Sequence, residues 1–229
     1  MPDMRELSLV HVVREPVPAA QPGGDRAPLL LLLHGVGSNE QSMVSLAAAF
    51  DPRFLVVSAR SPLTLGPSSF AWFHVTFTSG GPVIDADEAA AGWTHIAHFV
   101  DELVQTYGAD PARVYLAGFS QGANMALATL LTAPERIAGV AAMSGRLLPE
   151  VLPFAAPPAA LEGKRVLIVH GTGDQTLGVH FARSAREQLA RFPIALSYRE
   201  LDMGHRVTPE SLAVVQAWLT EALDVHRSA

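Results

Sequence analysis

Short apolar runs that alternate with helix-like segments are the feature that most limits how this chain can fold. The runs are rich in Leu, Val and Ile and cover residues 29–33, 54–57, 114–117, 139–143, 166–169 and 196–201. Between them lie segments with the spacing of helices, at about residues 41–49, 87–107, 122–131, 179–191 and 209–223. Such alternation is typical of βαβ units, in which helices cover both faces of a mostly parallel sheet. The sequence therefore predicts an α/β fold.

The pattern continues without an obvious break between domains. No linker-like stretch divides residues 1–229, and 49% of the residues are hydrophobic, which is enough for one large core. We therefore expect a single domain over residues 1–229. Residues 7–13 are expected to add an edge strand, joined to the first buried run by a Pro- and Gly-rich loop over residues 16–28.

Two segments fit this pattern poorly. Residues 61–83 hold aromatic side chains between Gly and Pro clusters, and residues 147–161 are rich in Pro and Ala. Long irregular segments in compact domains are often functional, so both could border a pocket. Alternatively, the aromatic residues close the edge of the core.

Composition argues against several classes of function. The formal net charge is −6 and Lys and Arg form no cluster, so the basic surface that nucleic-acid binding needs is missing. The longest aliphatic run, residues 29–33, is too short to cross a bilayer, and the charged N-terminus is unlike a secretion signal; we expect no stable membrane insertion. The chain has no cysteine, which excludes disulfides, a thiol nucleophile and thiolate metal sites. These features favour a cytoplasmic protein.

A serine flanked by glycines follows the third apolar run. The sequence Gly118-Phe119-Ser120-Gln121-Gly122 begins directly after a predicted strand and opens a predicted helix. A serine on such a sharp turn is typical of the nucleophile elbow of serine hydrolases, and the glycines let strand and helix pack closely around it. We therefore predict that Ser120 is a catalytic nucleophile.

Two further residues could complete a catalytic triad with Ser120. A serine hydroxyl becomes a good nucleophile when a histidine accepts its proton and a carboxylate orients that histidine. In a parallel sheet such residues follow the carboxyl ends of strands, and Asp174 and His205 follow the fifth and sixth runs. The order Ser, Asp, His is that of the α/β-hydrolase fold. Asp202 is the alternative orienter of the histidine, and His170 is interpreted as a packed, hydrogen-bonded residue.

The predicted chemistry also needs an oxyanion hole, which is a pair of N–H groups aimed at the charge that develops on the carbonyl oxygen. We expect the backbone N–H groups of Gln121, directly after the serine, and of Val36, in the glycine-containing loop after the first run. His95 and His98 have the spacing of a helical metal pair, but no third ligand accompanies them. We therefore expect no metal and no organic cofactor.

Taken together, these motifs resemble those of the phospholipase/carboxylesterase family of small α/β hydrolases, which includes acyl-protein thioesterases and bacterial carboxylesterases. The resemblance rests on residues 33–40, 72–73, 118–123, 143–145, 170–174 and 203–205 and covers nearly the whole chain. It implies a triad of Ser120, Asp174 and His205, with Val36 and Gln121 forming the oxyanion hole. That assignment is the same as the one reached from the chemistry of the residues.

The expected activity is hydrolysis of carboxylic esters with short to medium acyl chains through an acyl-serine intermediate. The partner would be a small ester or thioester, and a homodimer is compatible with the sequence. Among the apolar residues of segment 61–83, we expect Leu65, Trp72 and Phe73 to contact the acyl group. Two alternatives remain open: a lysophospholipase or acyl-protein thioesterase, and a binding module that keeps the fold without turnover.

Overall fold

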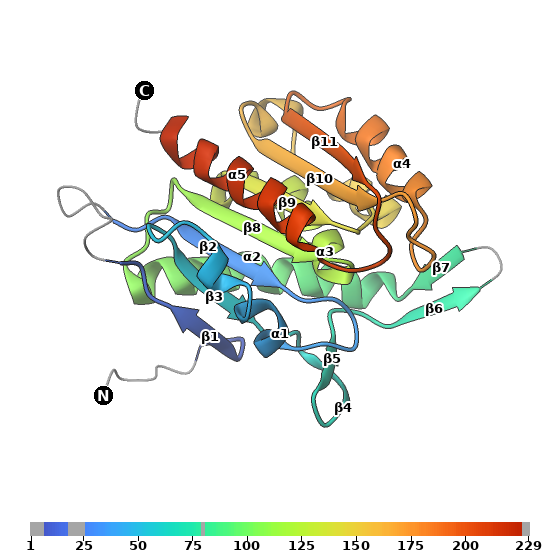
Figure 1. The fold of residues 1–229 in the computed structure, drawn as a ribbon, viewed down its shortest axis with the longest axis horizontal. Helices are drawn as coiled ribbons and strands as arrows, with labels where there is room; N and C mark the ends of the chain where they lie inside the picture. Colours follow the sequence, from blue (N-terminus) through green and yellow to red (C-terminus); the bar gives the residue numbers. More distant parts are fainter. Residues whose placement is uncertain (1–6, 18–25, 79–80, 226–229) are drawn as a thin grey trace.

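A seven-stranded sheet forms the centre of the protein, in a computed structural model that describes residues 7–17, 26–78 and 81–225 (Figure 1). The strand order is β1-β3-β2-β8-β9-β10-β11. The strands are β1 (His11–Arg14), β2 (Leu29–Leu33), β3 (Leu55–Ala59), β8 (Val114–Phe119), β9 (Gly139–Met143), β10 (Arg165–Gly171) and β11 (Ala195–Leu201). All neighbouring strands are parallel except β1, which pairs antiparallel with β3 at the edge. The predicted α/β class is confirmed, and each predicted run is a strand.

Helices cover both faces of the sheet. α2 (Ala86–Tyr107), α3 (Gln121–Thr132) and α4 (Val179–Leu189) lie on one face, and α1 (Glu40–Val44) and α5 (Pro209–Val225) lie on the other (Figure 1). Side chains of a strand point alternately to the two faces. In β2, Leu31 packs on the side of α2 and α3, whereas Leu32 packs on the side of α1 and α5. Because both faces are buried, every residue of β2 is apolar.

One helix is shorter than predicted. The expected helix at residues 41–49 is divided into α1 and a short 3₁₀ helix at Ala47–Ala49. The hydroxyls of Ser42 and Ser45 each donate a hydrogen bond to the backbone carbonyl three residues earlier. Side-chain hydrogen bonds of this kind compete with the backbone bonds that would continue the helix.

The two segments that did not fit the alternation of strands and helices form short strand pairs and 3₁₀ helices. Residues 61–83, together with the adjoining Ile84, contain two antiparallel pairs, β4 (Leu63–Gly66) with β5 (Ser69–Ala71), and β6 (Val75–Thr78) with β7 (Gly81–Ile84). Residues 147–161 contain 3₁₀ helices at Pro149–Phe154 and Pro158–Leu161. The β6–β7 hairpin extends beyond the carboxyl ends of the parallel strands (Figure 1). The hairpin therefore borders that end of the sheet.

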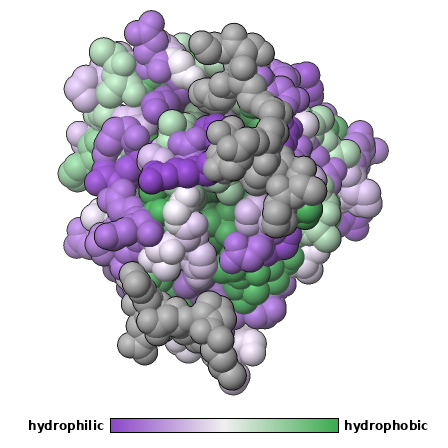
Figure 2. Space-filling model, turned by 90° about the vertical axis from the view of Figure 1, so that its left-hand side faces the viewer, coloured by the Kyte–Doolittle hydropathy of each residue, from purple (hydrophilic) through white to green (hydrophobic). Residues whose placement is uncertain are grey.

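The opposite end, where the parallel strands begin, has a mixed surface. Hydrophilic residues cover much of it and apolar residues are exposed between them (Figure 2). None of the described helices is long and apolar enough to cross a membrane. The expected edge strand at residues 7–13 is shorter than predicted, because β1 covers His11–Arg14 and residues 7–10 lie outside any strand. Part of the expected loop over residues 16–28 lies outside the described residues.

Candidate active site

Ser120 occupies a strained turn between β8 and α3. Its backbone angles are φ 54° and ψ −117°, in a region that residues with side chains seldom adopt. Its N–H donates a hydrogen bond of 2.9 Å to the Met143 carbonyl on neighbouring β9, which fixes the turn to the sheet. A Cβ on Gly118 would lie 2.3 Å from the Gly122 carbonyl carbon, and a Cβ on Gly122 would lie 2.1 Å from the Leu33 carbonyl oxygen. Both flanking positions therefore require glycine.

The side chains of Ser120, His205 and Asp174 form a chain of hydrogen bonds. His205 Nε2 lies 3.0 Å from Ser120 Oγ, and His205 Nδ1 lies 2.7 Å from Asp174 Oδ2. Because an ionised carboxylate can only accept, Nδ1 carries the proton, which leaves Nε2 free to accept from the serine hydroxyl. Asp202, the alternative orienter, is exposed on the preceding turn. The geometry brings together the three residues predicted as the triad.

The carboxylate of Asp174 is held by its own loop. Its Oδ1 accepts hydrogen bonds from the backbone N–H groups of Thr176, at 3.0 Å, and Leu177, at 2.8 Å. His170 Nε2 donates to the Leu177 carbonyl at 2.7 Å and lies 3.4 Å from Asp174 Oδ2. Burial lowers the pKa of His170, so this imidazole is neutral. It is packed and hydrogen-bonded as predicted, and its position next to Asp174 is a contact that the sequence did not indicate.

The loop after β2 brings Val36 close to the serine. An added Cβ at Gly35 would lie 3.2 Å from the Ser120 Cβ, so the loop passes directly over the elbow. Among the described residues, no acceptor is found for the Val36 backbone N–H. Val36 and Gln121 line the same small cavity at Ser120. This position is compatible with the predicted oxyanion hole.

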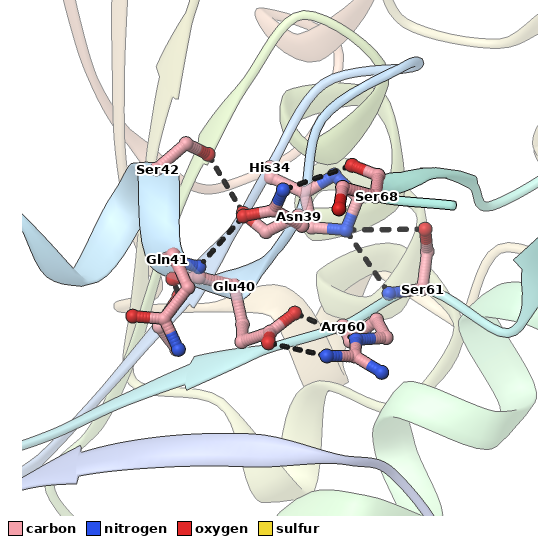
Figure 3. Close-up of polar contacts among 9 residues, drawn as sticks. His34, Asn39, Glu40, Gln41, Ser42, Arg60, Ser61 and Ser68 are labelled. Carbon is pink, nitrogen blue, oxygen red and sulfur yellow. Dashed lines mark hydrogen bonds and ion pairs between the residues drawn. The ribbon is translucent and has the colours of Figure 1, made fainter. Parts of the chain in front are cut away.

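A network of buried polar residues holds this loop in place (Figure 3). His34 Nδ1 donates to the Gly35 carbonyl at 2.8 Å, and His34 Nε2 accepts from the Ser61 backbone N–H at 3.1 Å. Burial lowers the pKa of His34, which agrees with the neutral ring that these two bonds need. The loop is thereby tied to the segment that follows β3.

An ion pair fixes the other end of the loop (Figure 3). The buried Glu40 carboxylate accepts two hydrogen bonds from the Arg60 guanidinium, at 2.6 and 2.7 Å, and these bonds lower the pKa of Glu40. The Glu40 carbonyl also accepts from the Ser58 hydroxyl of β3 at 2.7 Å. The beginning of α1, which directly follows the loop that carries Val36, is therefore anchored to β3 of the sheet.

Two cavities meet at Ser120. The larger, of about 510 Å³, has an apolar wall of Val36, Met43, Leu46, Phe119 and Val207, and His205 lines it. The smaller, of about 40 Å³, is lined by Val75, Pro82, Ile84, Gln121, Asn124 and Arg146. Of the residues that the structure describes, only Val36, Ser120 and Thr176 border both cavities. The serine therefore has a separate space on each side for the two halves of a substrate.

The three residues expected to contact the acyl group line neither cavity. Trp72 and Phe73 are each 1% exposed and belong to the core. The Trp72 indole donates to the His34 carbonyl at 3.0 Å, and the Gln121 side chain bonds to backbone groups of both aromatic residues. Leu65 lies on β4 and is 45% exposed. Trp72 and Phe73 thus pack beneath the site, because the segment folds its aromatic rings inward rather than over the serine.

Sequence reasoning missed Arg146 and the apolar wall from α1. Arg146 follows β9, so its place after the end of a parallel strand was a usable signal. Met43 and Leu46 follow the predicted oxyanion loop and gave no signal beyond helical spacing. His95 and His98 lie on α2, where His98 is 3.4 Å from Glu102. Within residues 7–17, 26–78 and 81–225, no group of three or more His, Asp or Glu could hold a metal ion.

Comparison with known proteins gives consistent matches over nearly the whole chain. The family model described as Phospholipase/Carboxylesterase matches residues 18–223. Acyl-protein thioesterase 1 of Kluyveromyces lactis is 28% identical, covering 95% of this chain and 98% of that protein. A probable inactive carboxylesterase of Oryza sativa subsp. japonica is 26% identical, covering 91% and 90%. A solved structure of the carboxylesterase from Mesorhizobium loti matches with a TM-score of 0.78 at 25% identity, covering 96% and 98%.

Proposed function

Because the chain belongs to the phospholipase/carboxylesterase family, we propose that it is a serine hydrolase that cleaves carboxylic esters through an acyl-serine intermediate. The observation that carries this proposal is the hydrogen-bonded chain Ser120–His205–Asp174 at the meeting point of two cavities. Besides the ester and water, the proposed chemistry uses only groups that the chain itself supplies.

In the proposed reaction, Ser120 Oγ attacks the ester carbonyl while His205 Nε2 accepts its proton. The negative charge that develops on the carbonyl oxygen is stabilised by the backbone N–H groups of Val36 and Gln121. His205 then gives its proton to the leaving alcohol oxygen, and an acyl-serine remains. Water, activated by the same histidine, releases the acid, while Asp174 keeps the imidazole oriented.

We assign the two cavities to the two halves of the ester from the position of His205. The leaving oxygen must come within hydrogen-bonding reach of Nε2 to receive a proton. His205 lines the cavity of about 510 Å³ and not the smaller one. The alcohol therefore occupies the large apolar cavity, and the acyl group occupies the small one. This placement supports a short acyl chain.

Two other functions need to be separated from this proposal. A thioester can be cleaved through the same acyl-serine chemistry as an ester. A preference for long acyl chains or thioesters would therefore favour a lysophospholipase or an acyl-protein thioesterase, the name that one relative carries. The relative named as probably inactive raises the possibility of a fold kept for binding alone. An activated serine would argue against that second reading.

One experiment separates these functions. A fluorophosphonate probe should label the wild-type protein rapidly and leave Ser120→Ala unlabelled, because only an activated serine reacts quickly. A panel of ethyl esters and thioesters from acetyl to palmitoyl would then rank the acyl groups. Absence of labelling and of turnover would contradict a hydrolase, and a preference for palmitoyl substrates would favour the thioesterase alternative.

A further inference from the structure

The small cavity beside Ser120 contains a buried arginine. Arg146 comes from the segment after β9 and is 9% exposed. Its side chain borders the cavity together with Val75, Pro82 and Ile84 of the β6–β7 hairpin. A guanidinium group is seldom buried at this depth without a carboxylate partner, because removal of its charge from water is costly.

The guanidinium of Arg146 has few partners in the protein. The shortest described hydrogen bond of Arg146 does not involve the guanidinium: the backbone N–H of Arg146 donates to Asn124 Oδ1 at 2.7 Å. The side chain itself makes a long contact of 3.4 Å from Nη2 to the Pro82 carbonyl, and its Cζ lies 5.8 Å from the centre of the Phe181 ring. A guanidinium offers five N–H donors, so most of its capacity is unused by these contacts.

Other arginines of the protein are paired differently. Arg53, Arg60, Arg113, Arg136, Arg165 and Arg183 each form an ion pair with an Asp or Glu side chain. Arg146 forms no such pair with any carboxylate of the described residues. Burial lowers its pKa, whereas the Glu150 charge acts in the opposite direction. Arginine nevertheless stays charged at neutral pH.

A second donor lies next to the guanidinium. Asn124 also lines the small cavity, and its Oδ1 is occupied by the Arg146 backbone N–H. The Nδ2 group of Asn124 has no hydrogen-bond partner among the described residues. The lining of the cavity therefore combines a buried positive charge with free N–H donors, which is the donor set that recognises a carboxylate.

We propose that Arg146 binds a carboxylate at the far end of a short acyl group. The preferred substrates would then be monoesters of short dicarboxylic acids. This inference rests on the proposed ester hydrolysis and on the placement of the acyl group in the small cavity. The reaction adds water across the acyl carbon–oxygen bond and yields the dicarboxylate, the alcohol and one proton. The carboxylate that Arg146 holds takes no part in the bond changes.

The test compares two substrates of nearly the same shape. Monoethyl succinate carries the terminal carboxylate, and ethyl succinamate replaces it with an uncharged amide. For the wild-type enzyme, we expect kcat/KM for monoethyl succinate to exceed that for ethyl succinamate by about 10- to 100-fold, the range of a charged hydrogen bond. Absence of this preference in a wild-type enzyme that hydrolyses neutral esters would overturn the proposal.

Variants then locate the carboxylate. Arg146→Gln should abolish most of the preference, and Arg146→Lys, which keeps the charge but loses the planar fork, should retain part of it. Arg191→Gln is the matched control, because it removes one exposed positive charge away from both cavities and should keep the wild-type ratio. Fluorophosphonate labelling of each variant checks that Ser120 is still active.

Two results would count against Arg146. An unchanged ratio in a labelled Arg146→Gln enzyme would overturn the assignment. A ratio lost in Arg206→Gln instead would place the carboxylate in the large cavity, which Arg206 lines. A wild-type protein that neither reacts with the probe nor hydrolyses any ester would contradict the proposed function itself, which separates the two failures.

Discussion

His205 Nε2 lies 3.0 Å from Ser120 Oγ, although 85 residues separate the two along the chain. The contact depends on two loops at the same end of the sheet, one after β8 and one after β11. It places an acceptor where the serine proton must go when the hydroxyl attacks a carbonyl.

Ser120→Ala is therefore expected to fold normally and to lose on the order of 10⁴ to 10⁶ in kcat. Ser144→Ala is the control, because Ser144 also follows a strand and has a positive φ of 49°, yet it is fully buried. Steady-state hydrolysis of an ethyl ester measures both. Near wild-type turnover by Ser120→Ala would remove this serine from the mechanism.

Substitution of the two candidate orienters should have very different effects. Asp174→Asn keeps the size of the side chain but removes the acceptor that fixes the His205 tautomer, so we expect kcat to fall by about 10⁴-fold. Asp202→Asn changes an exposed side chain and should leave kcat within about twofold of wild type. If Asp202→Asn were the more severe change, Asp202, on the same loop as His205, would have to be the residue that orients the imidazole.

Trp72 should act on stability rather than on the choice of acyl group. Trp72→Ala empties a buried site and is expected to lower the free energy of unfolding by about 3–5 kcal/mol. Leu65→Ala, at an exposed position of β4, should change it by less than about 0.5 kcal/mol. Urea unfolding gives both values. A Trp72→Ala enzyme of unchanged stability that accepts longer acyl chains would place this ring in the substrate path instead.

The buried His170 predicts how stability changes with pH. Burial lowers its pKa below the ordinary value of 6.5, so the unfolded chain takes up a proton at a pH where the folded protein does not. Its contribution to stability is present above pH 6.5 and is lost as the pH falls toward the lowered pKa. Urea unfolding at a series of pH values should show this decline, and His170→Gln should reduce it.

The sequence predicted the parts of the molecule that local patterns determine. The run at residues 29–33 is a strand with those same bounds. A strand of five leucines is typical of the centre of a parallel sheet, where helices bury both faces. The sequence predicts that Ser120, Asp174 and His205 lie close together, because each follows a predicted strand and the ends of parallel strands meet at one edge of the sheet. The structure brings the three side chains into one chain of hydrogen bonds.

What the sequence could not predict depends on contacts between distant segments. Trp72 could lie over the serine or beneath it, and only the packing against His34 and Gln121 decides. Arginine is usually exposed, so the burial of Arg146 depends on contacts with distant segments, among them Pro82 of the hairpin and Phe181 of α4. The strand bounds also differ by a residue or two, as for β10, since strand ends depend on neighbouring strands.

The two cavities at Ser120 are built from different parts of the chain. α1 and the loop that carries His205 supply the walls of one, while the β6–β7 hairpin and the segment after β9 supply the walls of the other. Apart from Val36, Ser120 and Thr176, a residue that borders one does not border the other. In the proposed reaction, substitutions in the walls of the large cavity would change which alcohol is accepted, and substitutions in the walls of the small cavity would change which acid is accepted. Evolution or laboratory selection would then alter one preference while the other is kept.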